Sequence, residues 1–464
     1  SLAIMPLENL SGDPGNQWIV DGVRNTLAQR LTGLPEFTIK NARRSYDGEP
    51  AEIAAVLGVE SLLFGDVQLQ DGALRIGYEI VRGRDNVTLV AGEVAGTTDR
   101  LFQLQEKLAS TIRDDLAGSE TPELIKLAAP DSAAYNSYMR GMYALEHRLE
   151  RDNLEVSMEL FRQSIDLDES YGPAYLGLAT AYALLPDYRG ADLEPHHDLA
   201  IATIEKGMSM APSIADPAGA IYGFVYHQQK RWRESEESYR RAVNAPVVDS
   251  NAFSWYSRML ASVGRLDESL DMALAAEQID PGSNLINSRI AMVYTWLDNP
   301  AKAHEYFDRA NDLDATGIIH VMAHSLLLWS GGQADLSRNL TFAAVQMEQA
   351  PTDWIDPVYR ALADPAYADE ALAEIDRAWE QRLVIADIVL VVRTLLGDID
   401  GAMEIAALLE QPGEAFSMEL LFIPQLRPLR EHPAFMPLLE RLGIVAYWAD
   451  ARCSWGNDRV RCET

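Results

Sequence analysis

A spacing of 34 residues recurs through the second half of this sequence and constrains its fold more than any other feature. Five alanines keep this spacing: Ala242, Ala276, Ala310, Ala344 and Ala378. Seven positions before each stands another small residue: Ser235, Ser269, Ala303, Ser337 and Ala371. Two antiparallel helices approach closely only where their facing side chains are small. The period therefore predicts repeated helix pairs that bury their apolar faces by stacking on one another.

In four of these units the first helix carries another small residue in phase. These residues are Gly223, Ser257, Ala291 and Ser325, and a large apolar residue follows three positions later at Tyr226, Leu260, Tyr294 and Leu328. A unit of 34 residues with two helices is typical of the tetratricopeptide repeat (TPR). We therefore expect an all-α TPR superhelix, an α-α solenoid of about seven to eight helix pairs, over residues 131–412.

Residues 1–118 differ from the repeats because short apolar runs alternate with single helical patterns. Strands are predicted at residues 2–7, 37–39, 60–70, 73–81 and 87–97, and helices at 18–31, 52–57 and 101–116. Asp71-Gly72 is a strong hairpin signal, and Gly58 is a typical helix end. The fold class expected is α+β, with a small β-α-β-α-β-β-β-α domain, a linker at 119–130 and C-terminal capping helices and tail at 413–464.

The charge of the chain limits its partners. With 70 acidic and 39 basic side chains the formal charge is −31, and such a surface repels nucleic acid and anionic lipid headgroups. The most apolar run, residues 383–396, contains Asp387 and Arg393 and falls short of the roughly 20 residues that span a bilayer. Because the sequence starts at Ser1 without a signal peptide, we expect a soluble region of a longer protein.

Both cysteines stand near the end of the sequence, at Cys453 and Cys462. A disulfide across so short a loop is geometrically easy and fits an oxidising compartment; two free thiols are the alternative. No histidine lies near the pair, so a zinc site is not expected there.

Three segments resemble a known bacterial family. They are LAIMPLENLSGDPGNQWIVDGVRNTLAQRLTGLPEFTI and LGVESLLFGDVQLQDGALRIGYEIV near the start, and IPQLRPLREHPAFMPLLERLGIVAYW near the end. The first two resemble the TolB-amino-terminal-like (FlgO-like) domain, which stands before TPR repeats in signalling proteins. In that family the region follows a winged-helix domain with one membrane helix (the ToxR/CadC-like regulators), a class III adenylate cyclase or a protein kinase.

The resemblance implies a non-catalytic sensory region of a membrane-bound signalling or transcription regulator. The TPR groove would bind a protein, peptide or small ligand, homodimerisation is a further expectation, and membrane attachment would use a segment outside this sequence. The cysteine pair favours the periplasmic region of an inner-membrane protein, and a cytoplasmic location is the alternative. A second interpretation is an envelope scaffold or assembly adaptor without a signalling role.

The candidate catalytic and metal-binding residues are few. His320 and His324 lie one helical turn apart, but the glutamate of a zinc-protease helix is missing and the repeat phase makes His324 a packing residue. His196-His197 would point to different sides of a helix. The loop at 11–15 lacks a phosphate-binding pattern, and spacing alone leaves a glycosidase-like carboxylate pair open. We expect no catalysis, no cofactor and no metal.

The binding surface can be placed through the repeat phase, because in TPR arrays the first helix of each pair lines the concave face. The residues predicted to point inward are Phe224, His227, Arg258, Met292, Trp296, Met322, Leu326 and Trp329. An exposed apolar groove rich in methionine and tryptophan marks a binding site. The alternative is a tight superhelix, or C-terminal helices that fold back over this face.

Overall fold

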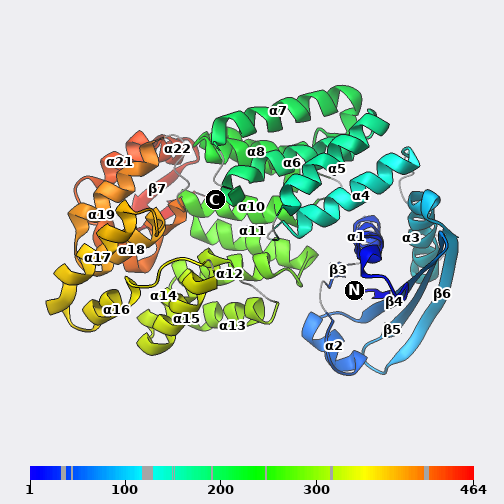
Figure 1. Ribbon diagram of the computed structural model, residues 1–464, viewed down its shortest axis with the longest axis horizontal. Helices are drawn as coiled ribbons and strands as arrows, with labels where there is room; N and C mark the ends of the chain where they lie inside the picture. Colours follow the sequence, from blue (N-terminus) through cyan, green and yellow to red (C-terminus); the bar gives the residue numbers. More distant parts are fainter. Residues whose placement is uncertain are drawn as a thin grey trace. The chain divides into compact units, whose positions relative to one another are not determined.

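The computed structural model describes residues 1–32, 38–42, 45–117, 129–148, 150, 152–189, 192–245, 248–313, 317–347, 349–411 and 417–463 (Figure 1). Phe37 and most of the expected linker lie outside these residues. The chain forms two compact units. The first comprises Ser1–Val225, Glu237–Ala252 and Ala276–Ser283, and the second comprises Tyr226–Glu236, Phe253–Ala275 and Asn284–Thr464.

The first unit begins with a mixed β-sheet in the order β3-β1-β4-β5-β6, with β2 also paired to β4. The strands are β1 (Leu2–Ile4), β2 (Glu8–Asn9), β3 (Ile39–Asn41), β4 (Ser61–Gln70), β5 (Ala73–Arg82) and β6 (Val87–Thr97). β1 runs parallel to β3 and β4, whereas β4, β5 and β6 form an antiparallel meander. Asp71 and Gly72 both have positive φ, which is the geometry of a type I′ hairpin turn.

Helices cover both faces of this sheet. Alternate side chains of β1 point to opposite sides, as the pleat requires. Leu2 and Ile4 pack with α1 (Gln17–Thr32) and α3 (Leu101–Ala117). Ala3 packs instead with α2 (Pro50–Leu57), which ends at Gly58 in the left-handed conformation.

The first repeat helix, α4 (Ser132–Glu146), belongs to the same core as the sheet and its helices. Met139 lies so close to α1 that a Cβ on Gly22 would be 2.2 Å from its Cε. The Tyr135 hydroxyl bonds to Gln105 of α3, and Asn25 Nδ2 donates to Glu146 Oε1 at 2.9 Å. The α/β region and the start of the helical array are therefore joined by direct packing.

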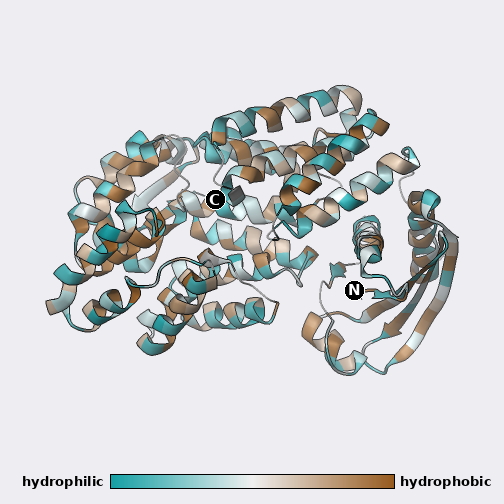
Figure 2. Ribbon diagram, in the orientation of Figure 1, coloured by the Kyte–Doolittle hydropathy of each residue, from teal (hydrophilic) through white to brown (hydrophobic). Residues whose placement is uncertain are grey.

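Eight helix pairs follow in the described part of the chain. They are α4 with α5 (Asn153–Leu167), α6 (Gly172–Arg189) with α7 (Leu193–Met210), α8 (Ala218–Gln228) with α9 (Trp232–Val243), α10 (Ser250–Ser262) with α11 (Leu266–Ile279), α12 (Asn284–Trp296) with α13 (Pro300–Asn311), α14 (Ile318–Ser330) with α15 (Ala334–Met347), α16 (Ile355–Ala363) with α17 (Ala368–Glu380), and α18 (Ala386–Leu395) with α19 (Ile399–Ala406). Hydrophobic and hydrophilic residues mix along these helices, as expected for helices that bury one face (Figure 2).

The alanines of the repeat are buried, and two pairs of the other small residues lie where the helices of a pair touch. All five alanines of the 34-residue series are buried. Ser257 on α10 lies 2.9 Å from Ser269 on α11, measured between hydroxyl oxygens, and Ser325 and Ser337 repeat this contact at 2.9 Å on α14 and α15. The coarse expectation, an α/β region followed by TPR-type helix pairs, is what the structure shows.

The end of the chain returns to the middle of the array within the second unit. After short 3-10 turns at Met418–Phe422 and Pro424–Leu426 come α20 (Arg427–Arg430), α21 (Phe435–Arg441), α22 (Ile444–Asp450) and the hairpin of β7 (Cys453–Gly456) and β8 (Arg459–Cys462). Trp448 Nε1 donates to the carbonyl of Val263 at 2.8 Å, and Trp232 Nε1 donates to that of Leu442 at 2.8 Å. No helix among the described residues is long and apolar enough to cross a membrane.

Candidate functional site

The eight residues predicted to line the groove divide into two groups by burial. Phe224, His227, Met292 and Trp296 are buried, whereas Arg258, Met322, Leu326 and Trp329 are partly exposed. The four buried side chains are closed to a partner in this structure, so an open groove over the whole set is not what the chain forms. The binding role of all eight stays a prediction.

Residues 417–426, which we call the C-terminal segment, carry a buried glutamate, Glu419. This glutamate lies against the first helices of the repeat pairs. We call the surface formed by His227, Arg258, Ser262, Arg289, Met292, Trp296, Met322, Leu326 and Trp329 the first-helix face, since all are on first helices of their pairs. Glu419 is only 3% exposed. Its Oε1 lies 3.2 Å from Arg289 Nη1 and 4.0 Å from Arg258 Nε, and its Oε2 accepts from Ser262 Oγ at 3.4 Å.

The protonation states around Glu419 follow from burial and from the two arginines. Burial raises the pKa of Glu419, but the charges of Arg289 and Arg258 outweigh it, so this pKa lies below its ordinary value. Burial, then Arg258, lowers the pKa of His227 to about 3, and its Nε2 lies 3.0 Å from Ser262 Oγ. At neutral pH the cluster therefore holds two cations, one carboxylate and a neutral imidazole.

A second buried carboxylate, Asp387, contacts the start of the segment that carries Glu419. Asp387 of α18 accepts the backbone N–H of Ser417 at 3.3 Å. Burial raises the pKa of Asp387 to about 6, and the nearby Glu419 adds to this effect. The start of the C-terminal segment is thus held by an acid that is costly to ionise.

The first-helix face continues on α14 as an apolar stripe. Ile319, Met322, Leu326 and Trp329 recur at spacings of three and four residues, which places them on one side of a helix. Ile319 is 38% exposed, and the other three are partly exposed. Gln425 Nε2 donates to Ser330 Oγ at 2.9 Å, so the C-terminal segment reaches the last turn of α14.

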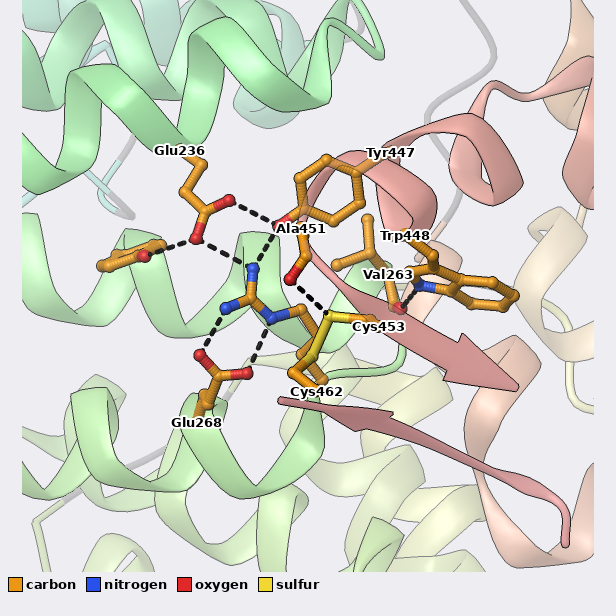
Figure 3. The surroundings of a disulfide bond; sticks show 10 residues. Glu236, Val263, Glu268, Tyr447, Trp448, Ala451, Cys453 and Cys462 are labelled. Carbon is orange, nitrogen blue, oxygen red and sulfur yellow. Dashed lines mark hydrogen bonds and ion pairs between the residues drawn. A yellow bond between two sulfur atoms is a disulfide. The ribbon is translucent and has the colours of Figure 1, made fainter. Parts of the chain in front are cut away.

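The C-terminal hairpin lies beside a buried ion-pair network (Figure 3). Arg265 Nη1 donates to Glu236 at 2.8 Å, and its Nε donates to Glu268 at 2.7 Å. The Tyr447 hydroxyl donates to the other Glu236 oxygen at 2.8 Å, and burial raises the pKa of this phenol. These contacts fix α22 against α9 and α11.

A disulfide joins Cys453 to Cys462 and closes the hairpin that follows α22, with Cα atoms 3.9 Å apart. Trp455 of this hairpin stacks on Trp448 with ring centroids 5.8 Å apart. The hairpin is therefore held both covalently and by aromatic packing.

The histidines considered as metal ligands are packed in the structure. His320 and His324 are buried, and His324 stacks on Phe307 with ring centroids 4.5 Å apart. Burial, then His324, lowers the pKa of His320 to about 4. His197 is buried, whereas His196 Nδ1 lies 2.8 Å from the Asp192 carbonyl. Within the described residues no group of three or more His, Cys, Asp or Glu is arranged to hold a metal ion.

The glycine-containing loop at 11–15 forms a local turn. Asp13 Oδ1 accepts the backbone N–H of Gly15 at 2.8 Å, and Asn9 Oδ1 accepts the Ser11 hydroxyl at 2.6 Å. Its polar side chains thus cap the turn that leads into α1.

Sequence reasoning missed Arg289 of the first-helix face and Glu419, the buried carboxylate that lies against this face. Arg289 lies on α12, one turn before the predicted Met292. Glu419 is the one charged residue in the run SMELLFIP, and a lone charge in an apolar run is a signal of a paired, buried group. That signal could have identified Glu419 but not its partner.

No protein-family model matches the chain. A Rhizobium meliloti (strain 1021) protein described as "Putative adenylate cyclase 3" is 24% identical over 188 residues, which are 39% of this chain and 32% of that protein. Anaphase-promoting complex subunit 3 of Schizosaccharomyces pombe is 25% identical over 122 residues, 26% of this chain and 18% of that protein. The matches thus span less than two thirds of either relative.

Solved structures with similar helices include pilus proteins and a TPR protein. Pseudomonas aeruginosa PilF has a TM-score of 0.35 at 15% identity, covering 47% of this chain and 90% of that one. PilW, a type IV pilus biogenesis factor, has a TM-score of 0.34 at 13% identity, covering 47% and 92%. YrrB, a TPR protein with a peptide-binding site, has a TM-score of 0.26 at 21% identity, covering 41% and 91%. These likenesses are too weak to carry an argument about function.

Proposed function

We propose that this chain is a non-catalytic protein-interaction region of a bacterial signalling protein. It would hold a protein or peptide partner on the first-helix face of its TPR pairs. The observation that carries the proposal is the α14 stripe, where Met322, Leu326 and Trp329 remain partly exposed on one side of a helix. Partly exposed apolar side chains in a continuous row are typical of a docking surface.

The position of the partner can be tested with a charge on the stripe and a matched charge on another helix. Leu326→Asp places a carboxylate among the apolar residues of α14. Leu336→Asp places the same group on α15, where the leucine is 57% exposed. Proteins that co-purify with the wild-type chain from its source cells are expected to stay with the Leu336 variant and be lost from the Leu326 variant. Equal retention by both folded variants would show that the α14 stripe is not the docking surface.

The signalling part of the proposal is supported by the packing of the α/β region on the array. Tyr135 and Met139 of α4 share one core with α1 and α3. A shift of the first repeat helix would therefore move side chains in the core of the α/β region. A relay of this kind suits a regulator better than a plain scaffold. The relative described as an adenylate cyclase is consistent with an output domain elsewhere in the full protein.

The location proposed is the periplasmic side of an inner membrane, with the cytoplasm as the alternative. It is supported by the cysteine pair of the C-terminal hairpin.

One measurement tests the signalling role, and another tests the location. The coding sequence upstream of Ser1 should contain an output domain, and a signal peptide alone would favour the scaffold interpretation. Thiol titration of freshly isolated protein should find Cys453 and Cys462 oxidised, and two free thiols would favour the cytoplasm.

A further inference from the structure

We propose that Arg258 and Arg289 form a binding site for a peptide carboxylate flanked by apolar residues, and that residues 417–426 of this chain fill it in cis. The proposal rests on the proposed function, since it takes the first-helix face as the partner-binding face. It adds the chemistry of the ligand: a glutamate or aspartate followed by leucine- or phenylalanine-like residues.

The chemistry of the site is that of carboxylate recognition. Arg258 and Arg289 come from first helices of successive pairs, and both approach Oε1 of Glu419. Ser262 donates to the other oxygen, and His227 contacts Ser262. The Arg289 guanidinium donates a hydrogen bond to this carboxylate, and the Arg258 guanidinium adds a second positive charge at ion-pair distance. Two guanidinium groups beside one carboxylate oxygen favour an anionic ligand.

The energetics favour recognition over stability as the purpose of this pair. Burying two opposite charges costs desolvation that their attraction barely repays, and apolar residues of similar size usually stabilise as well or better. Around Glu419, apolar side chains already supply the burial: Leu421, Phe422, Ile423 and Leu426 are nearly inaccessible. A charge at this place instead fixes which residue of the segment meets the arginines.

The segment itself lies on the face as a bound peptide would. It has two short 3-10 turns where the repeats have long helices, and it ends against Ser330 of α14. Arg430 Nη1 donates to the carbonyl oxygens of Leu421 at 3.0 Å and Ile423 at 2.6 Å. Asp458 of the disulfide-closed hairpin holds Arg430 through two bonds of 2.6 and 2.7 Å. The hairpin therefore holds the segment through Arg430.

The test uses the full chain and two fluorescein-labelled peptides. One peptide has the sequence of residues 417–426, SMELLFIPQL, and the other has glutamine in place of the glutamate. Arg430→Gln loosens the hold of the hairpin on the segment, and Arg427→Gln is the matched control because Arg427 is largely exposed. A tethered segment competes at a high effective concentration, so the wild-type chain and the control should bind the peptide weakly.

The Arg430 variant should bind the glutamate peptide about 10-fold more tightly than the wild-type chain does, and the glutamine peptide about 10-fold more weakly than the glutamate peptide. Adding Arg289→Gln should remove the difference between the peptides. Equal binding of the two peptides by a folded Arg430 variant overturns the proposal. The proposal is also overturned if this variant binds neither peptide although hydrogen–deuterium exchange shows that its residues 417–426 have become accessible.

A second measurement serves if the Arg430 variant does not fold. In Glu419→Gln, hydrogen–deuterium exchange of residues 417–426 should accelerate about 10-fold while α14 to α17 stay unchanged. Unchanged exchange in the segment, or uniform acceleration, overturns the proposal. The Leu326→Asp co-purification test is independent of these results, so the cis site and the α14 stripe can fail separately.

Discussion

Two parts of the first-helix face differ in charge and in burial. On α10 and α12 the first-helix face carries Arg258 and Arg289, and both lie within ion-pair distance of the buried Glu419. On α14 the same face is apolar and partly exposed. Two positions of one repeat phase differ in burial: Met292 is 6% exposed, whereas Leu326, 34 residues further on, is partly exposed. The repeat phase thus predicts which residues share the face, but it does not predict which of them remain accessible.

The largest expected effect is on the covered part. Arg289→Leu removes the nearer of the two arginines beside the buried Glu419, and it should lower the free energy of unfolding by about 3 kcal/mol. The double change Arg289→Leu with Glu419→Leu should recover most of this loss, because no charge is stranded. Urea denaturation of both variants measures the difference. A double variant as unstable as the single one would show that the pair itself stabilises the fold.

Removing the disulfide should have the next largest effect. Replacing both cysteines by serine frees a loop with a sequence separation of 9 residues. Chain entropy for a loop of this size corresponds to a loss of about 2–3 kcal/mol. Thermal unfolding with and without a reductant checks this: the reductant should lower the Tm of the wild-type chain and leave that of the serine variant unchanged.

Asp387 should make stability depend on pH. Its folded pKa of about 6 lies above its ordinary value of 3.8, so the folded chain binds a proton between these pH values that the unfolded chain does not. The free energy of unfolding therefore falls as pH rises through this window, and the full cost is present above pH 6. Asp387→Asn keeps an acceptor for Ser417 and should stabilise the chain by roughly 2 kcal/mol at pH 7.5, with little effect at pH 3.5. An equal change at both pH values would contradict the assigned cause.

The smallest effect on stability belongs to the open part. Leu326→Asp changes a partly exposed side chain, so the free energy of unfolding should fall by only about 1 kcal/mol or less. Urea denaturation beside Leu336→Asp measures this. A loss comparable with that of Arg289→Leu would mean that α14 is a covered structural helix like α12.

The sequence predicts the repeats well because their signal is local and periodic. The 34-residue series of alanines locates five units, and Asp71-Gly72 locates a hairpin, from positions that lie close in the chain. Each depends on a backbone or packing requirement that few residue types meet.

The contact of Arg258 and Arg289 with Glu419 could not be predicted in the same way. Arg289 and Glu419 are 130 positions apart, and the chain has 70 acidic residues from which a partner could be drawn. Long-range pairing of this kind leaves no periodic trace. Only the isolation of Glu419 in an apolar run indicated that its charge would be buried and paired.

Methionine oxidation can measure how accessibility differs along the first-helix face. Dilute peroxide followed by mass spectrometry reports the accessibility of Met292 and Met322 on one face, with the 62% exposed Met347 as a reference. In the folded wild-type chain Met347 and Met322 should oxidise, and Met292 should be protected. Oxidation of Met292 as fast as that of Met322 would contradict the division of the first-helix face into a covered part and an open part.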